Sequence, residues 1–200
     1  MQRLCVFCGA ANGSQSSFKL QAIELGKKLV ADGLDLVYGG GHVGLMGVLA
    51  DTVLEAGGKV IGVIPEDLVT KELAHQGLTE LKIVKSLAQR KAMMLELSDG
   101  FIAIPGGYGT VEEFCEMLTG SMLGLHKKPC GLLNTNGYYD HLLKFFDNAV
   151  QNHFVSVGHR SLILVSQSPE DLIERMKSFK HNIPARWFNG AESGSAGSGY

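Results

Sequence analysis

The chain has 200 residues, of which 45% are hydrophobic and 19% are charged, and its net charge is −2. This length and composition predict one globular domain with a buried core and exclude an intrinsically disordered protein. The charge lacks the basic excess of a non-specific nucleic-acid binder, so we expect no nucleic-acid partner.

Short apolar runs alternate along the chain with longer segments of helical periodicity. In chain order we expect a strand at 4–8, a helix at 17–32, a strand at 34–38, a helix at 44–56, a strand at 59–64, a polar loop at 66–78, a strand at 81–84, a helix at 86–97, a strand at 100–104, a helix at 110–125, a strand at 129–133, a helix at 138–151, a strand at 162–165 and a helix at 169–179.

Strands that alternate with helices in this way predict βαβ crossovers and a parallel sheet. The strands are apolar throughout, as expected where helices cover both faces of a sheet. We therefore predict an α/β fold, a single-domain Rossmann-like doubly wound parallel sheet over residues 1–180. Residues 181–200 would form a carboxy-terminal tail, which is Gly/Ser/Ala-rich and expected to be disordered from about residue 190.

We expect no targeting signal in this sequence. Its amino-terminal apolar run is too short for a signal peptide, and no apolar stretch approaches the ~18 residues of a membrane span. Cys5 and Cys8 form a C-x-x-C motif, but Cys115 and Cys130 are too far apart to complete a zinc site, so buried apolar cysteines are favoured. We expect a cytoplasmic protein with no membrane partner.

A first glycine-rich loop lies between a strand and a helix. Gly39, Gly41 and Gly44 fit G-x-G-x-x-G, a pattern in which backbone N–H groups can bind a phosphate. Neither a P-loop ending nor a well-placed acidic residue follows, so a lone phosphate or a mononucleotide is favoured over NAD or ATP. The alternative is tight packing of the helix on the strand. The candidate phosphate or ribose contacts in this loop are Gly40, Gly41, Gly44 and Met46.

A second glycine-rich loop, PGGYGTVEE, spans residues 105–113 and again joins a strand to a helix. Two such turns in one small sheet indicate one shared ligand cleft. Glu113 has two interpretations from this motif: a carboxylate beside a bound sugar, or the third residue of a capping box with Thr110 as N-cap. Arg90 and Lys91 also have two: ligand contacts, or a solvated basic face together with Lys85.

The seven histidines show no spacing typical of a metal site, so no metal ligand is expected. His42, in the first glycine loop, is the histidine that we place near a ligand. Met93 and Met94 are expected in the core.

The motifs YGGGHVGLMG, RKAMM, PGGYGTVEE, LGLHKKP and LLNTNGYYD occur in this order over roughly residues 3–177. On these motifs the chain resembles the Lonely Guy (LOG) family of cytokinin riboside 5′-monophosphate phosphoribohydrolases, often mislabelled as lysine decarboxylases. The resemblance implies hydrolysis of the N-glycosidic bond of an adenosine 5′-monophosphate-type nucleotide to free base and ribose 5-phosphate. It also implies no cofactor, and a homodimer or an assembly of dimers with sites near the interface.

By motif, Arg90 and Glu113 match the catalytic pair of the family. Glu113 would stabilise an oxocarbenium-like state and orient or deprotonate water, while Arg90 would hold the phosphate or ribose. The other substrate contacts that the resemblance implies are Glu72, Lys91, Gly107, Tyr108, Gly109, Thr110, Val111, Glu112 and Thr119.

The sequence departs from the family pattern near the site. The family commonly has Met-His-Glu where this chain has Leu87-Ala88-Gln89, and Trp and Gln where this chain has Gly120 and Met122. These departures leave the preferred base open. They also keep a second hypothesis, a non-catalytic nucleotide or cofactor carrier of the same fold. A third, amino-acid decarboxylation, needs a pyridoxal-phosphate lysine for which no sequence context is recognisable.

Overall fold

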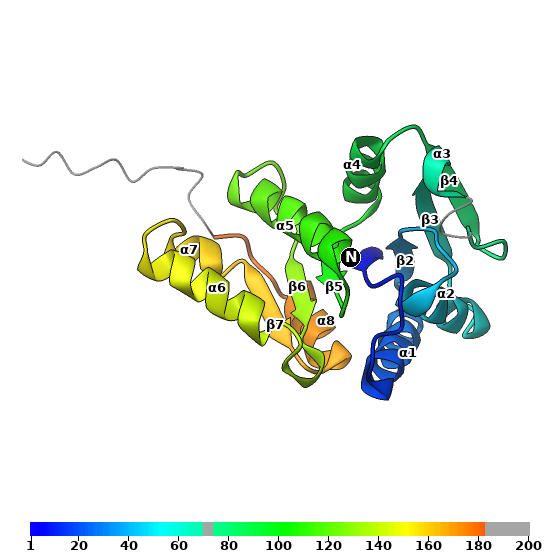
Figure 1. The fold of residues 1–200 in the computed structure, drawn as a ribbon, viewed down its shortest axis with the longest axis horizontal. Coiled ribbons are helices and arrows are strands. Elements are labelled where there is room, and N and C mark those ends of the chain that lie inside the picture. The colour runs from blue at the N-terminus through cyan, green and yellow to red at the C-terminus, as the bar shows by residue number, and fades with distance from the viewer. Residues whose placement is uncertain (70–73, 183–200) are drawn as a thin grey trace, which may run out of the picture.

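The computed structural model describes residues 1–69 and 74–182 (Figure 1). Seven strands form one sheet in the order β4-β3-β2-β1-β5-β6-β7. Every neighbouring pair is parallel. The strands are β1 (Arg3–Phe7), β2 (Asp35–Tyr38), β3 (Val60–Pro65), β4 (Glu80–Val84), β5 (Gly100–Ala103), β6 (Cys130–Leu133) and β7 (Ile163–Ser166).

Helices connect the strands and lie on both faces of the sheet (Figure 1). They are α1 (Ser16–Ala31), α2 (Gly44–Glu55), α3 (Glu66–Val69), α4 (Leu87–Leu97), α5 (Tyr108–Met122), the 3₁₀ turn η1 (Thr135–Gly137), α6 (Asp140–Gln151), α7 (Val157–Arg160) and α8 (Pro169–Lys177). No helix in the described part of the chain is long and apolar enough to cross a bilayer.

Two cores follow from the alternation of side chains along the strands. In β1, Leu4 and Val6 pack with α1, α2 and α8. Cys5 and Phe7 point to the opposite face and pack with α4, α5 and α6. The fold is therefore three layers, and the predicted doubly wound α/β class is confirmed.

The strand order reverses at β1. The chain runs outward from β1 through β2 and β3 to β4, then returns through α4 to β5 on the other side of β1. In a doubly wound sheet the ligand crevice opens at this reversal, at the carboxyl ends of the strands. The loops that follow β1, β2 and β5 therefore meet where a ligand is expected.

The structure differs from the predicted elements mainly in short helical segments. The expected polar loop at 66–78 begins with the single turn α3, and its residues 70–73 lie outside the described residues. Neither η1 nor α7 was expected, because segments of three and four residues are too short to show a helical period. Most of the expected tail, from residue 183, is likewise outside the described part.

Candidate functional site

Arg90 and Glu113 meet at the carboxyl end of the sheet. Arg90 lies in α4 and is only 6% exposed, and its Nε is 3.8 Å from Oε1 of Glu113 in α5. A charged side chain is seldom this deeply buried unless it is paired. The solvated basic face is therefore wrong for Arg90, and the structure brings the two predicted catalytic residues together.

The first glycine loop holds the far end of Arg90. Its Nη2 donates a hydrogen bond of 3.1 Å to the carbonyl oxygen of Gly39. A Cβ atom on Gly39 would lie 2.1 Å from that nitrogen and 3.2 Å from Sδ of Met46. Glycine at this position therefore leaves space for a buried guanidinium.

The amino end of α5 is open to solvent. The helix begins at Tyr108 with Gly107 as N-cap, and no side chain caps it. Gly107 and Gly109 are exposed, and a Cβ on either would meet no atom within 4 Å. The first N–H groups of a helix carry a partial positive charge and bind anions such as phosphate, so this end provides an accessible anion site.

The same geometry corrects the capping-box interpretation. With the N-cap at Gly107, Thr110 is the third helical residue and Glu113 the sixth, too far along to reach the N-cap backbone. Thr110 is buried, with Oγ1 2.1 Å from where a Cβ on Gly106 would lie. Glu113 therefore has no capping role, and its side chain instead lies beside Arg90.

The amino end of α2 is occupied by the protein itself. The Leu45 N–H donates to the Gly9 carbonyl at 3.0 Å. Gly44 has a φ of +62°, and a Cβ there would lie 2.3 Å from the carbonyl carbon of Ala10. Met46, a predicted ligand contact, is 5% exposed and belongs to the core. Tight packing thus accounts for Gly44 in the first loop, and the amino end of α5 is the more accessible of the two predicted phosphate-binding loops.

Gly40 and Gly41 are also held by protein groups. The Gly40 carbonyl accepts from the backbone N–H of His75 at 3.0 Å, and the Gly41 carbonyl accepts from the Tyr38 hydroxyl at 3.2 Å. Both glycines are buried. Their contact with a phosphate or a ribose remains a prediction.

Two tyrosines that the sequence analysis gave no role fasten the second glycine loop. The Tyr138 hydroxyl donates to the Gly106 carbonyl at 2.7 Å, and the Tyr139 hydroxyl donates to the Ile104 carbonyl at 2.8 Å. Burial raises the pKa of Tyr139, so this hydroxyl keeps its proton. The sequence feature that could have indicated this role is the Asn-Gly turn before the two tyrosines, because this turn directs their side chains back toward β5.

Lys91 bridges α4 and α5. Its ammonium pairs with both Glu112 and Glu116, and hydrogen bonds, first to Glu112 and then to Glu116, raise the pKa of Lys91. This lysine is therefore a fixed cation at the edge of the site. Substrate contacts by Lys91, Glu112 and the half-buried Val111 remain predictions.

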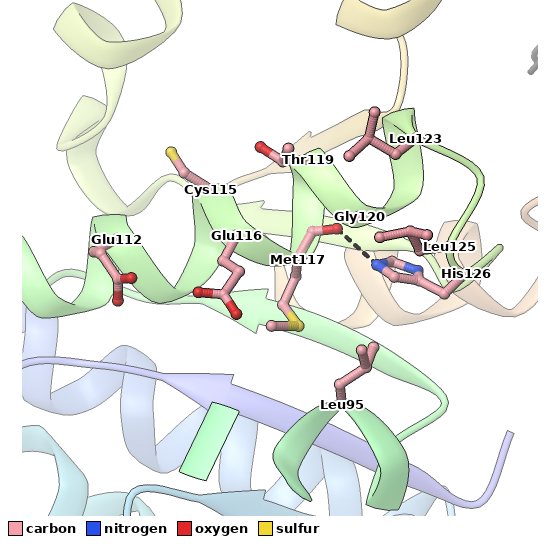
Figure 2. A pocket seen from close by; sticks show the side chains of 10 residues that line it. All are labelled: Leu95, Glu112, Cys115, Glu116, Met117, Thr119, Gly120, Leu123, Leu125 and His126. Carbon is pink, nitrogen blue, oxygen red and sulfur yellow. Dashed lines mark hydrogen bonds between the residues drawn. The ribbon is translucent and has the colours of Figure 1, made fainter. Parts of the chain in front are cut away.

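Of the remaining predicted substrate contacts, one falls outside the described residues and one lies away from the Arg90–Glu113 pair. Glu72 lies outside the described residues. Thr119 is six residues beyond Glu113 in α5, about 9 Å along the helix axis. It lines a separate pocket of about 420 Å³, which Figure 2 shows between α5 and Leu95 of α4.

Gly120, where the family commonly has Trp, also lines this pocket. A Cβ on Gly120 would lie 3.1 Å from Cδ2 of His126. His126 is held in place because its Nε2 lies 2.7 Å from the Met117 carbonyl and its Nδ1 accepts from the Lys128 N–H at 3.1 Å. A side chain larger than glycine at this position would therefore need His126 to move.

Comparison with known proteins places the chain among named relatives. A family model described as "Possible lysine decarboxylase" matches residues 46–176. A probable cytokinin riboside 5′-monophosphate phosphoribohydrolase of rice, Oryza sativa subsp. japonica, is 48% identical over 89% of this chain and 71% of its own. The corresponding cytokinin riboside 5′-monophosphate phosphoribohydrolase of Arabidopsis thaliana is 47% identical over 89% and 84%.

Solved structures share the fold at lower identity. The molybdenum cofactor carrier protein of Chlamydomonas reinhardtii superposes with a TM-score of 0.68 at 23% identity, over 88% of this chain and 96% of its own. The molybdenum cofactor binding protein of Rippkaea orientalis gives 0.66 at 23%, over 89% and 97%. These likenesses concern the fold alone. The family model and the close plant relatives together show that the chain belongs to the LOG family.

Proposed function

We propose that the protein is a nucleotide N-glycosidase that hydrolyses cytokinin riboside 5′-monophosphates, which are N6-modified adenosine 5′-monophosphates, to free base and ribose 5-phosphate. The observation that carries the proposal is the pairing of buried Arg90 with the partly buried Glu113, beside the open amino end of α5. Family membership supports it, since relatives 47–48% identical carry this activity in their names.

In the proposed reaction the phosphate binds the open N–H groups at Gly107, Tyr108 and Gly109, which fixes the ribose near Glu113. Binding energy from this remote group holds the reacting bond in place. Cleavage of the ribosyl–base bond builds positive charge on the sugar ring. The Glu113 carboxylate stabilises that charge, orients water for attack on the anomeric carbon and accepts the proton that this water loses. The C–N bond breaks with its electron pair on the base, and the base takes up a proton as it leaves.

Arg90 has a charge-positioning role in this scheme. Its hydrogen bond to Gly39 fixes one end of the guanidinium, while its Nε faces the Glu113 carboxylate. The guanidinium keeps its charge at any pH that the protein tolerates. It therefore places a permanent positive charge beside the carboxylate that the mechanism uses.

The decarboxylase description fits the lysines of the site poorly. A Schiff-base lysine must lose its proton, whereas two carboxylates raise the pKa of Lys91. Burial does lower the pKa of Lys128, but Lys128 precedes β6 at the amino end of the sheet, away from the Arg90–Glu113 pair.

We further propose that the protein acts as a homodimer with its sites near the interface. Thr119 lies about 9 Å from Glu113 along the axis of α5 and points about 120° away from it around the helix, so a site that uses both residues would need Thr119 from a partner chain. Light scattering coupled to gel filtration tests this, and a monomer that is fully active contradicts it.

The activity is tested by incubating the protein with N6-isopentenyl-AMP and with AMP, and measuring free base and ribose 5-phosphate. We expect turnover that Glu113→Gln abolishes, while the variant still folds with a melting temperature lowered by loss of the carboxylate beside the buried Arg90. Glu55→Gln, an exposed change at the end of α2, should remain active. A fully active Glu113→Gln refutes the assignment. Tight nucleotide binding without turnover by the unaltered protein favours the carrier hypothesis.

A further inference from the structure

Three potential metal ligands converge beside the first glycine loop. His42 lies in that loop, Asp51 lies in α2, and His75 follows the residues 70–73. One ligand atom from each lies within 4.8 Å of the other two. Their spacing along the sequence matches no metal motif, so only the fold brings them together. We propose that His42, Asp51 and His75 bind a divalent transition-metal ion, with zinc as the expected ion.

The geometry of the three side chains suits one ion. Nε2 of His75 is 2.8 Å from Oδ1 of Asp51, and the rings of His42 and His75 lie 4.7 Å apart and nearly perpendicular. Zinc with nitrogen and oxygen ligands at about 2.0–2.2 Å needs ligand atoms roughly 3–4 Å apart. The exposed His42 side chain can rotate to close the remaining distance, while buried His75 stays in place.

The hydrogen bonds of His75 define what metal binding changes. The Gly77 N–H donates to Nδ1 of His75 at 3.0 Å, so Nε2 carries the ring proton and donates it to Asp51. When an ion binds Nε2, the proton shared with Asp51 moves to Nδ1 of the same ring. A protonated Nδ1 cannot accept a hydrogen bond, so the Gly77 N–H loses its acceptor. Because Gly77 is exposed, its N–H can bind water instead, so the loss of this acceptor leaves no buried donor unpaired on Gly77.

The ligand types select the class of metal. Two imidazoles and one carboxylate are typical of zinc and its transition-metal neighbours, whereas magnesium and calcium prefer a shell of oxygen atoms. Three protein ligands leave a fourth position for water. The exposed His42 provides a route for the ion from solvent.

The site is connected to the Arg90 contact through two successive carbonyls. Gly39 accepts from Arg90, and Gly40 accepts from the backbone N–H of His75. An ion bound by His42 and His75 would cross-link the glycine loop to the segment at 74–75. We therefore assign the ion to holding this loop, and not to the chemistry at Glu113.

Zinc binding to the full chain is measured by titration calorimetry with ZnCl₂ after treatment with a chelator and its removal. We expect one ion per chain. His42→Ala and Asp51→Asn should each weaken binding by at least about tenfold. The matched control is His141→Ala, an exposed histidine on α6, which should bind as the unaltered protein does.

Thermal unfolding gives a second readout, because a ligand that binds the folded state raises the melting temperature. ZnCl₂ should raise it in the unaltered protein and in His141→Ala, and by much less in His42→Ala. The proposal is overturned if zinc does not bind saturably, or if His42→Ala binds it as tightly as the unaltered protein, which places the ion elsewhere. Equally tight binding of MgCl₂ would overturn the transition-metal class.

Discussion

Gly39→Ala tests the inference that glycine at this position leaves space for the buried Arg90 guanidinium. The backbone at Gly39 is not in the left-handed region, so alanine adds a methyl group without backbone strain. That methyl carbon would lie 2.1 Å from Nη2 of Arg90, whereas atoms in contact are about 3.5 Å apart. The guanidinium must therefore move by more than about 1 Å.

The expected effect can be worked from the contacts that this movement breaks. Arg90 loses its 3.1 Å bond to the Gly39 carbonyl and its alignment with Glu113. A hydrogen bond that involves a charged group contributes about 1.5–3 kcal/mol, so we expect a loss of about 2–3 kcal/mol in the free energy of unfolding. A misplacement of about 1 Å can reduce a rate about 100-fold, so we expect kcat/KM to fall about 100-fold.

The assay is a double-mutant cycle with Arg90→Ala, using urea unfolding and nucleotide hydrolysis. With the guanidinium removed, the methyl group has room, and Gly39→Ala should then change stability by less than about 0.5 kcal/mol. Gly158→Ala is the control, because Gly158 lies in exposed α7 and a Cβ there meets no atom closer than 3.8 Å. If Gly39→Ala has the same effect with and without Arg90, the reasoning is wrong.

Four further substitutions test other contacts in the structure. Gly106→Ala should lower the free energy of unfolding by about 1–3 kcal/mol, because its Cβ would lie 2.8 Å from the Gly9 backbone nitrogen. A Cβ on Gly107 meets no atom within 4 Å, so Gly107→Ala should keep the free energy of unfolding of the unaltered protein. It should bind AMP about tenfold more weakly when binding is measured by calorimetry. Lys91→Met should lower the free energy of unfolding by only about 0.5–1 kcal/mol, since the two carboxylate partners of Lys91 are half exposed. In urea unfolding at about 0.5 M NaCl this decrease should be smaller than at low salt, because salt screens the ion pairs. Burial lowers the pKa of His126, so the unfolded chain takes up a proton before the folded chain does as the pH falls below about 6.5. The free energy of unfolding should therefore decline there by up to about 1.4 kcal/mol per pH unit. His126→Asn should make this decline less steep when unfolding is measured between about pH 7.5 and 5.5, and equal slopes in the two proteins would contradict the prediction.

The sequence by itself determined the architecture and the two loops. Apolar runs such as that around Leu4, separated by helical periods, specify a parallel sheet with helices on both faces, because these signals are carried by residues close together in the chain. The glycine clusters marked the strand–helix turns for the same reason. The motif resemblance also singled out Arg90 and Glu113, and the fold places Nε of Arg90 3.8 Å from Oε1 of Glu113.

Only the tertiary structure decided which alternative held at each ambiguous position. Glu113 is free of a capping role because α5 begins at Gly107, and the amino end of α2 is closed because the loop after β1 packs against Gly44. Arg90 reaches Gly39 across 51 residues. Such contacts depend on how crossovers return the chain to one edge of the sheet, and no local periodicity carries that information. The convergence of His42 with Asp51 and His75 has the same origin.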